Sequence, residues 1–327
     1  MKAFRYERAK TVEAAVAATA AGGAVLKANG LDLLDRLKER IDEPDRIVTL
    51  IDVPGLDRIE AIEGGRIRIG AMVTLAGLVS TPSLALPRAL VDAASEAASP
   101  QLRNRATVGG NLCQHTRCGY YRVKTFDCLK RGVGGCPVIA PGGVQETAGI
   151  FGNNPCACAH PSSLAPVFGA LGAKVVVKGK SGERRISVSE LYRPPVVGQA
   201  SDTTLAPGDV ITSIEISGQA QHTAFYEVRQ RASYDWALVS CAVAFSGGEA
   251  AVKDAGIWLG AVAPSPMRAV EAEKALIGIG RPFSEALATA AAEAAVIGAT
   301  PLAGNAYKVE LVKVAVKRAL MAAWEKH

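Results

Sequence analysis

Apolar and polar positions follow two different spacings over the first fifty residues. Residues 11–21 and 31–39 carry apolar side chains at helical intervals, whereas residues 24–27 and 47–52 are short apolar runs of the kind found in buried strands. Helix and strand segments in alternation are typical of helices packed on a sheet. The pattern therefore predicts a small α/β unit over about residues 1–55.

The middle of the chain predicts a second unit. The stretch IEAIEGGRIRIGA alternates as a β-hairpin with Gly64 and Gly65 at its turn, and PRALVDAASEAAS has a helical pattern. Regular structure returns with LAPVFGALGAKVVVKGKSGERRISVSEL, which predicts a helix and a hairpin that turns at 180–182. We assign residues 56–217 to this unit, which forms a first domain together with residues 1–55.

A domain boundary is expected near Ser217 to Gln221. Beyond it, residues 226–264 are rich in strand patterns, and the chain from Met267 onward is largely helical and closes with a helix over 305–325. The predicted fold class is α+β: a two-part α/β domain over residues 1–217 is followed by a smaller α+β domain over residues 218–327.

One long segment, residues 112–158, has few periodic apolar positions and many Gly, Pro and Cys residues. Loops of this length are uncommon in compact domains unless another feature organises them. We therefore predict a structureless insertion that needs a further source of order.

The cysteines of the insertion are candidate metal ligands, since six of the seven in the chain lie between positions 113 and 158. Nine, seven and nineteen residues separate Cys118, Cys128, Cys136 and Cys156, a spacing that matches no standard zinc template. Irregular loops suit an iron–sulfur cluster, because they can direct thiolates from several sides. Spacing leaves Cys113 and Cys158 as competing ligands. The alternatives are disulfides, which a cytoplasmic location disfavours, and unligated buried thiols.

Charge is concentrated in the same region. The chain has a net charge of +6, and seven cations lie between Arg103 and Arg131 against one acid, Asp127. Such a patch can hold a diphosphate, offset an anionic cluster or dock an acidic partner, and the alternative is a solvated loop. Aromatic residues make up only 5% of the chain, which fits poorly with a stacking surface for nucleic acid.

Two glycine turns are candidate phosphate-binding sites. Thr107-Val108-Gly109-Gly110-Asn111 has the composition to expose consecutive backbone N–H groups, and a turn at residues 29–33 follows a strand and opens a helix. Most glycine turns are simply turns, so neither is specific alone.

No run of 18 apolar residues occurs, so we expect no membrane span. The expected location is the cytoplasm, or the periplasm through co-export with a partner.

Taken in order, these stretches resemble the FAD-binding subunits of the xanthine oxidase family of molybdenum hydroxylases. They are particularly similar to the flavin subunit of bacterial periplasmic aldehyde oxidoreductases, which carries an additional [4Fe-4S] cluster. The resemblance covers essentially the whole chain and is carried by FRYERAKTVEAAV, KANGLDLLDRLK, RIGAMVTLAGL, QLRNRATVGGNL, the cysteine insertion, AHPSSLAPVFGAL, VRQRASYDWALVS, GAVAPSPMR and NAYKVELVKVAVKRAL.

The resemblance implies a PCMH-type FAD-binding domain over residues 1–217, a C-terminal domain of the molybdenum hydroxylase flavoprotein type, and a set of cofactor contacts. The implied FAD contacts are Ala28, Asn29, Gly30, Leu31, Asp32, Leu33, Ala71, Thr74, Thr107, Gly109, Gly110, Asn111, Ser163 and Ile211. The implied ligands of a [4Fe-4S] cluster are Cys118, Cys128, Cys136 and Cys156.

Three departures from the family pattern bear on FAD affinity and flavin potential. The usual Ala-Gly-Gly-Thr-Asp loop is Ala-Asn-Gly-Leu-Asp over residues 28–32 here. Ser162-Ser163 stands where relatives often have Ser-Asp, and Glu227 stands where a Lys is common.

The resemblance implies an electron-transfer subunit of a heterotrimeric molybdenum enzyme. A large subunit would oxidise the substrate, an aldehyde or N-heterocycle, at a molybdenum cofactor. Electrons would pass through [2Fe-2S] centres of a small subunit to the FAD of this chain and then to an external acceptor. Two alternatives are a self-sufficient FAD oxidase and a metal-stabilised interaction or nucleic-acid module. No histidine or acid cluster stands out as a substrate-handling site, which disfavours the oxidase.

Overall fold

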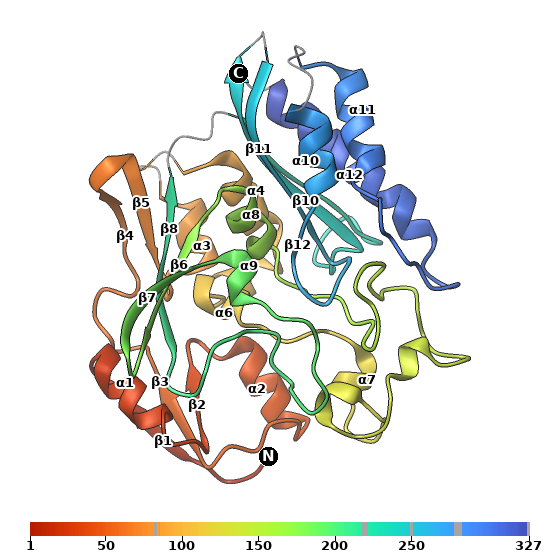
Figure 1. Cartoon of the computed structure of the whole chain (residues 1–327). Coiled ribbons are helices and arrows are strands. Elements are labelled where there is room, and N and C mark those ends of the chain that lie inside the picture. The colour runs from red at the N-terminus through yellow and green to blue at the C-terminus, as the bar shows by residue number, and fades with distance from the viewer. Residues whose placement is uncertain (82–83, 85, 218–221, 249–250, 278–282, 326–327) are drawn as a thin grey trace.

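The computed structural model describes residues 1–81, 84, 86–217, 222–248, 251–277 and 283–325. Three sheets organise the chain (Figure 1). The predicted domain boundary at 217–221 lies mostly outside the described residues. No helix within the described ranges is long and apolar enough to cross a membrane.

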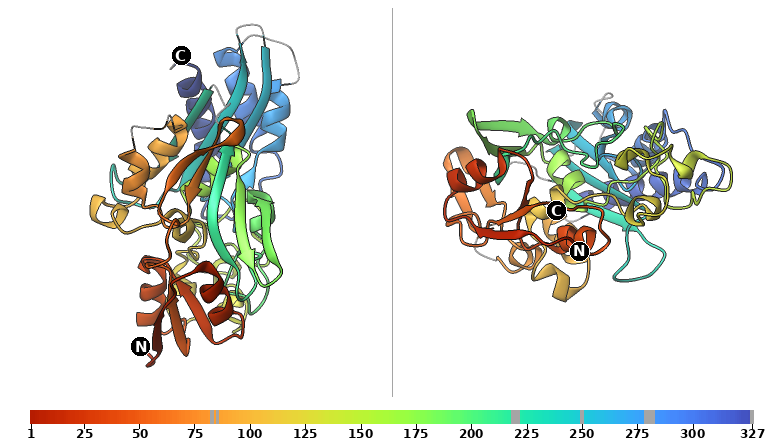
Figure 2. Two further views of the ribbon diagram at one scale, coloured as in Figure 1. Left: turned by 90° about the vertical axis from the view of Figure 1, so that its left-hand side faces the viewer. Right: turned by 90° about the horizontal axis from the view of Figure 1, so that it is seen from below.

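The first sheet is parallel and three-stranded, in the order β1-β3-β2, and lies at the N-terminal end of the molecule (Figures 1 and 2). Its elements are β1 (Arg5–Arg8), α1 (Val12–Thr19), β2 (Ala24–Lys27), α2 (Leu31–Lys38) and β3 (Arg46–Thr49). The predicted α/β unit is confirmed, and only β1 lacked a sequence signal. Parallel strands require crossover connections, which α1 and α2 provide.

The second sheet is antiparallel and five-stranded, in the order β4-β5-β8-β6-β7. Both predicted hairpins are confirmed. The strands are β4 (Ile59–Ile62), β5 (Arg66–Gly70), β6 (Lys174–Gly179), β7 (Gly182–Ser187) and β8 (Val210–Ser217). The helices of this unit are α3 (Leu75–Val79), α4 (Arg88–Glu96), α5 (Pro100–Arg103), α6 (Val108–Leu112), α8 (Leu164–Ala170) and α9 (Val188–Leu191).

The third sheet is antiparallel, in the order β12-β11-β10-β9, and both of its faces are buried. On β10, Val243 and Phe245 pack toward the C-terminal helices, whereas Ala242 and Ala244 pack into the core that contains α8. The elements are β9 (His222–Val228), β10 (Val239–Gly248), β11 (Ala251–Gly260), β12 (Met267–Arg268), α10 (Val270–Ile277), α11 (Glu285–Ala294) and α12 (Tyr307–Trp324).

Glycine allows α8 and β11 to approach closely. A Cβ at Gly256 would lie 2.3 Å from the carbonyl oxygen of Ala170 and 3.0 Å from its carbonyl carbon and Cα. A Cβ at Gly169 would lie 2.3 Å from the Trp258 ring. The close approach joins the two domains through one continuous core.

The insertion is less structureless than predicted. It contains the short helices α7 (Gly119–Arg122), η2 (Leu129–Arg131) and η3 (Pro137–Ile139), and is otherwise irregular. Its end is held by the C-terminal domain, because the Asn305 side-chain amide donates to the carbonyls of Ala148 and Gly149, both at 3.2 Å. The buried Lys308 ammonium donates to Ala148 O at 2.8 Å and Ala261 O at 2.7 Å.

Candidate functional site

A cavity of about 930 Å³ lies where the two domains and the insertion meet. Four stretches of chain supply most of its wall: residues 26–33 from the β2–α2 loop, residues 96–120 from the end of α4 into the insertion, residues 157–163 before α8, and residues 227–238 after β9. Its volume falls within the range typical of cofactor sites in proteins.

Ten of the fourteen predicted FAD contacts line this cavity: Ala28, Asn29, Gly30, Leu31, Asp32, Leu33, Thr107, Gly110, Asn111 and Ser163. The other four, Ala71, Thr74, Gly109 and Ile211, are not among the described residues that line it. Gly109 N donates to Ala71 O at 2.8 Å, and Thr74 forms an isolated β-bridge with Thr107. The structure thus brings both glycine turns to one cavity, and direct contact of each residue with FAD stays a prediction.

The first glycine turn leaves backbone donors available at the start of α2. Gly30 precedes the helix with φ +83°, a left-handed conformation that favours glycine. Within the described chain, the N–H groups of Leu31, Asp32 and Leu33 have no hydrogen-bond acceptor. Unpaired N–H groups and the positive end of the helix dipole favour an anion at this end of α2.

The second glycine turn differs from its prediction. The N–H groups of residues 108–111 donate to Val73 O, Ala71 O, Thr107 Oγ1 and Thr107 O, so the expectation that they face a diphosphate is wrong. Thr107 instead caps the short helix α6. The glycines are needed for close packing, since a Cβ at Gly109 would lie 3.0 Å from Ala71 Cβ.

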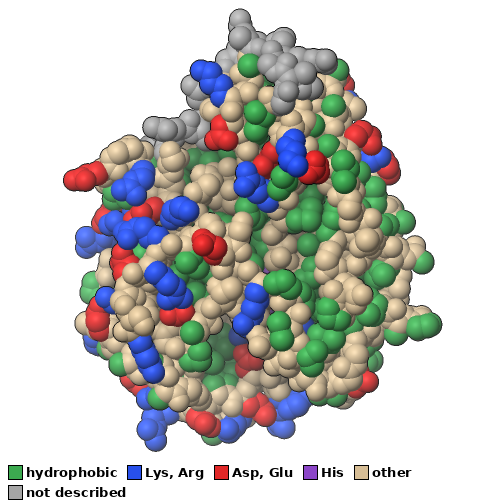
Figure 3. All heavy atoms as spheres, viewed as in Figure 1, with side chains coloured by type: hydrophobic (Ala, Val, Ile, Leu, Met, Phe, Trp, Pro, Cys, Tyr) green, Lys and Arg blue, Asp and Glu red, His purple; other side chains and the backbone are tan. Residues whose placement is uncertain are grey.

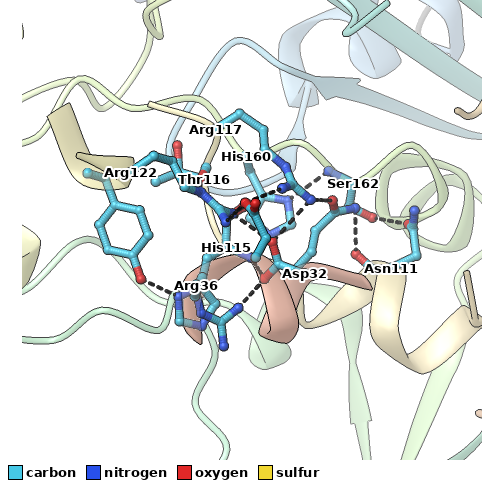
Figure 4. Close-up of polar contacts among 12 residues, drawn as sticks. Asp32, Arg36, Asn111, His115, Thr116, Arg117, Arg122, His160 and Ser162 are labelled. Atoms are coloured by element: carbon cyan, nitrogen blue, oxygen red, sulfur yellow. Dashed lines mark hydrogen bonds and ion pairs between the residues drawn. The ribbon is translucent and has the colours of Figure 1, made fainter. Parts of the chain in front are cut away.

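Asn111 joins the second turn to the segment before α8. Its Oδ1 accepts a hydrogen bond from Ser162 Oγ at 2.6 Å and another from Leu164 N at 3.2 Å (Figure 4). Ser162 Oγ in turn accepts from Ala165 N at 3.0 Å. These bonds fix Ser163, which follows Ser162, at the cavity wall.

Asp32 connects the first turn to the cysteine insertion. Its Oδ1 lies 2.6 Å from Arg122 Nη2 and 3.1 Å from Arg117 Nη2, and its Oδ2 pairs with Arg36 and accepts from His115 N at 3.1 Å (Figure 4). Arg122 also pairs with Asp35 at 3.0 Å. One carboxylate thus binds α2 to residues 115–122.

The charges around Asp32 keep it ionised. Burial alone would raise its pKa, but the guanidinium groups of Arg36, Arg117 and Arg122 outweigh that effect and lower the pKa to about 2. The carboxylate is therefore charged throughout the physiological range.

Most cations between Arg103 and Arg131 bind acceptors within the chain, and whether this patch docks a partner stays a prediction. Lys130 is fully buried against Asp202, and Arg131 donates to the carbonyls of Tyr120, Val123 and Phe126. Lys124 lies 3.7 Å from Glu43. Over the face in Figure 3, Lys and Arg side chains gather over the second sheet, whereas hydrophobic side chains gather over the side of the insertion and the C-terminal helices.

Five of the insertion's six cysteines are close together. Cys156 and Cys158 form a buried group with Leu129, against which Cys118 and Cys136 pack. Hydrogen bonding with the Cys156 thiol and burial raise the pKa of Cys136, and Cys128 interacts electrostatically with Cys118. Cys113 lies apart, at the edge of the core around α8. In the part of the chain that the structure describes, no group of three or more His, Cys, Asp or Glu side chains is arranged to hold a metal ion, so the [4Fe-4S] cluster stays a prediction.

Sequence reasoning missed several residues of the cavity wall. His160 and Trp236 line it, and the Arg117 guanidinium lies 4.6 Å from the Trp236 ring centroid. No spacing signal indicated that residues 229–238 fold back onto the insertion. Glu227 was noted only as a departure from a family pattern.

These features define a two-domain protein with a large cofactor cavity between its domains. Residues 2–217 match the model of the FAD binding domain in molybdopterin dehydrogenase, and residues 224–323 match that of the CO dehydrogenase flavoprotein C-terminal domain. The chain therefore belongs to the family of FAD-binding subunits of molybdenum hydroxylases.

Individual relatives match over nearly their whole lengths. The chain is 35% identical to the aldehyde oxidoreductase FAD-binding subunit PaoB of Escherichia coli (strain K12), covering 96% of each chain. It is 29% identical to the carbon monoxide dehydrogenase medium chain of Hydrogenophaga pseudoflava, covering 98% of this chain and 97% of the relative.

Solved structures of such subunits share the fold of this chain. Carbon monoxide dehydrogenase from Hydrogenophaga pseudoflava matches with a TM-score of 0.75 at 29% identity, over 98% of this chain and 97% of that one. Quinoline 2-oxidoreductase from Pseudomonas putida 86 matches with a TM-score of 0.76 at 25% identity, over 99% of both chains. The predicted fold class and family are confirmed.

The Asp32 ion pairs predict a pH-dependent contribution to stability. We expect Asp32→Asn to lower the melting temperature at pH 6.5, because three guanidinium groups lose their shared partner. A folded pKa of about 2 lies below the unfolded value of about 3.9, so the stabilisation is complete above about pH 5 and declines as the pH falls toward 2. The difference in melting temperature between the two proteins should therefore be constant above about pH 5, begin to narrow near pH 4 and become small only as the pH approaches 2.

The control is Asp57→Asn, which removes an exposed carboxylate outside the cavity. Equal melting temperatures of wild type and Asp32→Asn at pH 6.5 would contradict the role given to Asp32.

Proposed function

We propose that this chain is the FAD- and [4Fe-4S]-containing electron-transfer subunit of a heterotrimeric molybdenum hydroxylase of the aldehyde oxidoreductase type. The observation that carries the proposal is the cavity in which residues 28–33, residues 161–163 and three residues of the second glycine turn (Thr107, Gly110 and Asn111) converge. When bound, FAD accepts an electron pair and passes it on singly or together.

The start of α2 is the best support for FAD binding. Its free N–H groups and the left-handed Gly30 suit the diphosphate of a dinucleotide. The remainder of the cavity wall is predominantly apolar and includes Leu26, Leu75 and Trp236, which suits the flavin and adenine rings.

The cysteine cluster supports an iron–sulfur group. In a [4Fe-4S] cluster each thiolate binds a different iron at a corner of the cube. The four thiols must therefore lie near one another, but they need not all point at one atom. The insertion supplies such a set on irregular chain, with Cys118, Cys128, Cys136 and Cys156 as the proposed ligands. Burial lowers the pKa of Lys130, whereas the neighbouring Cys158 and Cys156 raise it. The Lys130 ammonium therefore adds positive charge beside these cysteines.

The partners follow from the names of the relatives. One is an FAD-binding subunit of an aldehyde oxidoreductase and another is the medium chain of a carbon monoxide dehydrogenase. We infer that a molybdopterin-binding large subunit and a [2Fe-2S] small subunit assemble with this chain. The compartment is that of the complex, either the cytoplasm or the periplasm after joint export.

Gly30 provides a test of the FAD site. Gly30→Ala forces a residue with a Cβ into the left-handed region at φ +83°, at a cost of roughly 1–2 kcal/mol. We expect FAD affinity to fall about tenfold, because the variant turn relaxes from this geometry in the free protein and must return to it to bind FAD, and roughly 1.4 kcal/mol corresponds to that factor. Titration of the FAD-free protein with FAD, followed by flavin fluorescence, measures the change.

Gly22→Ala is the matched control, since Gly22 has φ +82°, no neighbour within 4 Å of an added Cβ, and no place in the cavity wall. It should lose similar stability without losing affinity. An equal loss of FAD affinity in both variants would argue against a site at α2.

The iron content of the purified protein tests the proposed [4Fe-4S] cluster. The purified chain should show flavin absorption bands together with a broad iron–sulfur shoulder. Replacing Cys118, Cys128, Cys136 or Cys156 singly by Ser should remove most of the iron. The loop has little core of its own, so its order depends on metal binding. Cys113→Ser and Cys158→Ser should retain it.

A wild-type chain with stoichiometric FAD and no iron after anaerobic reconstitution would overturn the cluster while leaving the flavin function intact. A colourless zinc protein would instead support the metal-stabilised interaction module.

A further inference from the structure

Glu227 places a buried carboxyl in the wall of the cofactor cavity. It lies near the end of β9, and its side chain is 7% exposed. Its ion-pair partner is Arg229, whose Nε lies 3.1 Å from Glu227 Oε1. A buried carboxylate with a single partner is poorly stabilised in its charged form.

Among the described residues, the cation that pairs with Glu227 is Arg229, and this cation is shared. Arg229 Nη2 pairs with Glu96 Oε2 of α4, and Arg229 Nη1 donates to Glu96 O at 3.3 Å. Two carboxyl groups therefore compete for one guanidinium group.

The surroundings of Glu227 contain few other charges. Uncharged Ser240 faces it from β10, and α4 contributes Glu96. The segment after β9 contributes Asp235 to the same cavity. The helix α12 packs against β9 as well, but its Arg318 lies over the ring of the preceding residue, Tyr226. Burial raises the pKa of Glu227 to about 7, against the lowering effect of Arg229 and with a small rise from Glu96.

We propose that Glu227 takes up a proton when two electrons enter the cofactor cavity, so that this residue makes the reduction of the bound flavin depend on pH. The inference rests on the proposed FAD function. The carboxylate combines with one proton from solvent to give the neutral acid, while the electrons come from the redox centres of the partner subunits.

Electrostatics gives the direction of the effect. Negative charge that arrives in a poorly solvated cavity disfavours a nearby carboxylate and raises its pKa further. By linkage, reduction becomes harder when Glu227 is ionised and easier when it is neutral. The effect is therefore absent well below pH 7 and develops as the pH rises above 7.

The test is the flavin midpoint potential of the purified FAD-loaded chain, measured by dithionite titration at pH 6 and pH 8.5. Glu227→Gln should match wild type at pH 6. At pH 8.5 it should be reduced more easily, by about tenfold or more in the equilibrium constant, which is about 30 mV for a two-electron couple. Glu227→Asp, which keeps an ionisable group, should retain the pH dependence of wild type.

Glu60→Gln is the control, because Glu60 is exposed on β4 and does not line the cavity. Equal potentials of wild type and Glu227→Gln at pH 8.5 would overturn the inference, as would a difference of the same size at both pH values. A wild-type chain that binds no FAD would instead refute the proposed function.

Discussion

The ion pairs of Asp32 are the interaction on which the arrangement of the site depends. Asp32 stands in the first turn of α2, next to the backbone donors at the cavity, and its carboxylate binds both arginines that flank Cys118 in the chain. The first glycine turn and the cysteine insertion are therefore fixed relative to one another mainly by this carboxylate, with Asp35 as a second partner of Arg122. Because three cations hold its pKa at about 2, the carboxylate stays charged and this connection persists at neutral and mildly acidic pH.

The C-terminal domain holds the other end of the insertion in place. Asn305 and Lys308, both fully buried, bind carbonyls at its end, and the third sheet that supports them packs against α8 on its opposite face. An insertion with little core of its own is thus held by polar contacts from two domains. The same contacts bring its cysteines and the cavity together, since Cys118 and Cys158 belong to the cavity wall.

Local patterns predicted the elements that carry an apolar run or a regular spacing of apolar positions, such as β2 and both hairpins of the second sheet. They missed β1, whose sequence RYER is mostly exposed and has no apolar alternation. They also missed α6, because two glycines disfavour a helix that tertiary contacts and the Thr107 cap impose. The ion pairs within the charge patch were missed for another reason: Lys130 and Asp202 lie 72 residues apart, and Arg122 and Asp32 lie 90 apart, so no local pattern reveals their pairing.

The central claim is that electrons reach the flavin of this chain from a partner rather than from a substrate bound here. Stopped-flow absorbance of the flavin tests it directly, with an aldehyde mixed anaerobically with the complex purified through this chain and, separately, with the chain alone. The account predicts rapid bleaching of the flavin in the complex and none in the isolated FAD-loaded chain. Bleaching of the isolated chain by the aldehyde would contradict it and identify a self-sufficient oxidase.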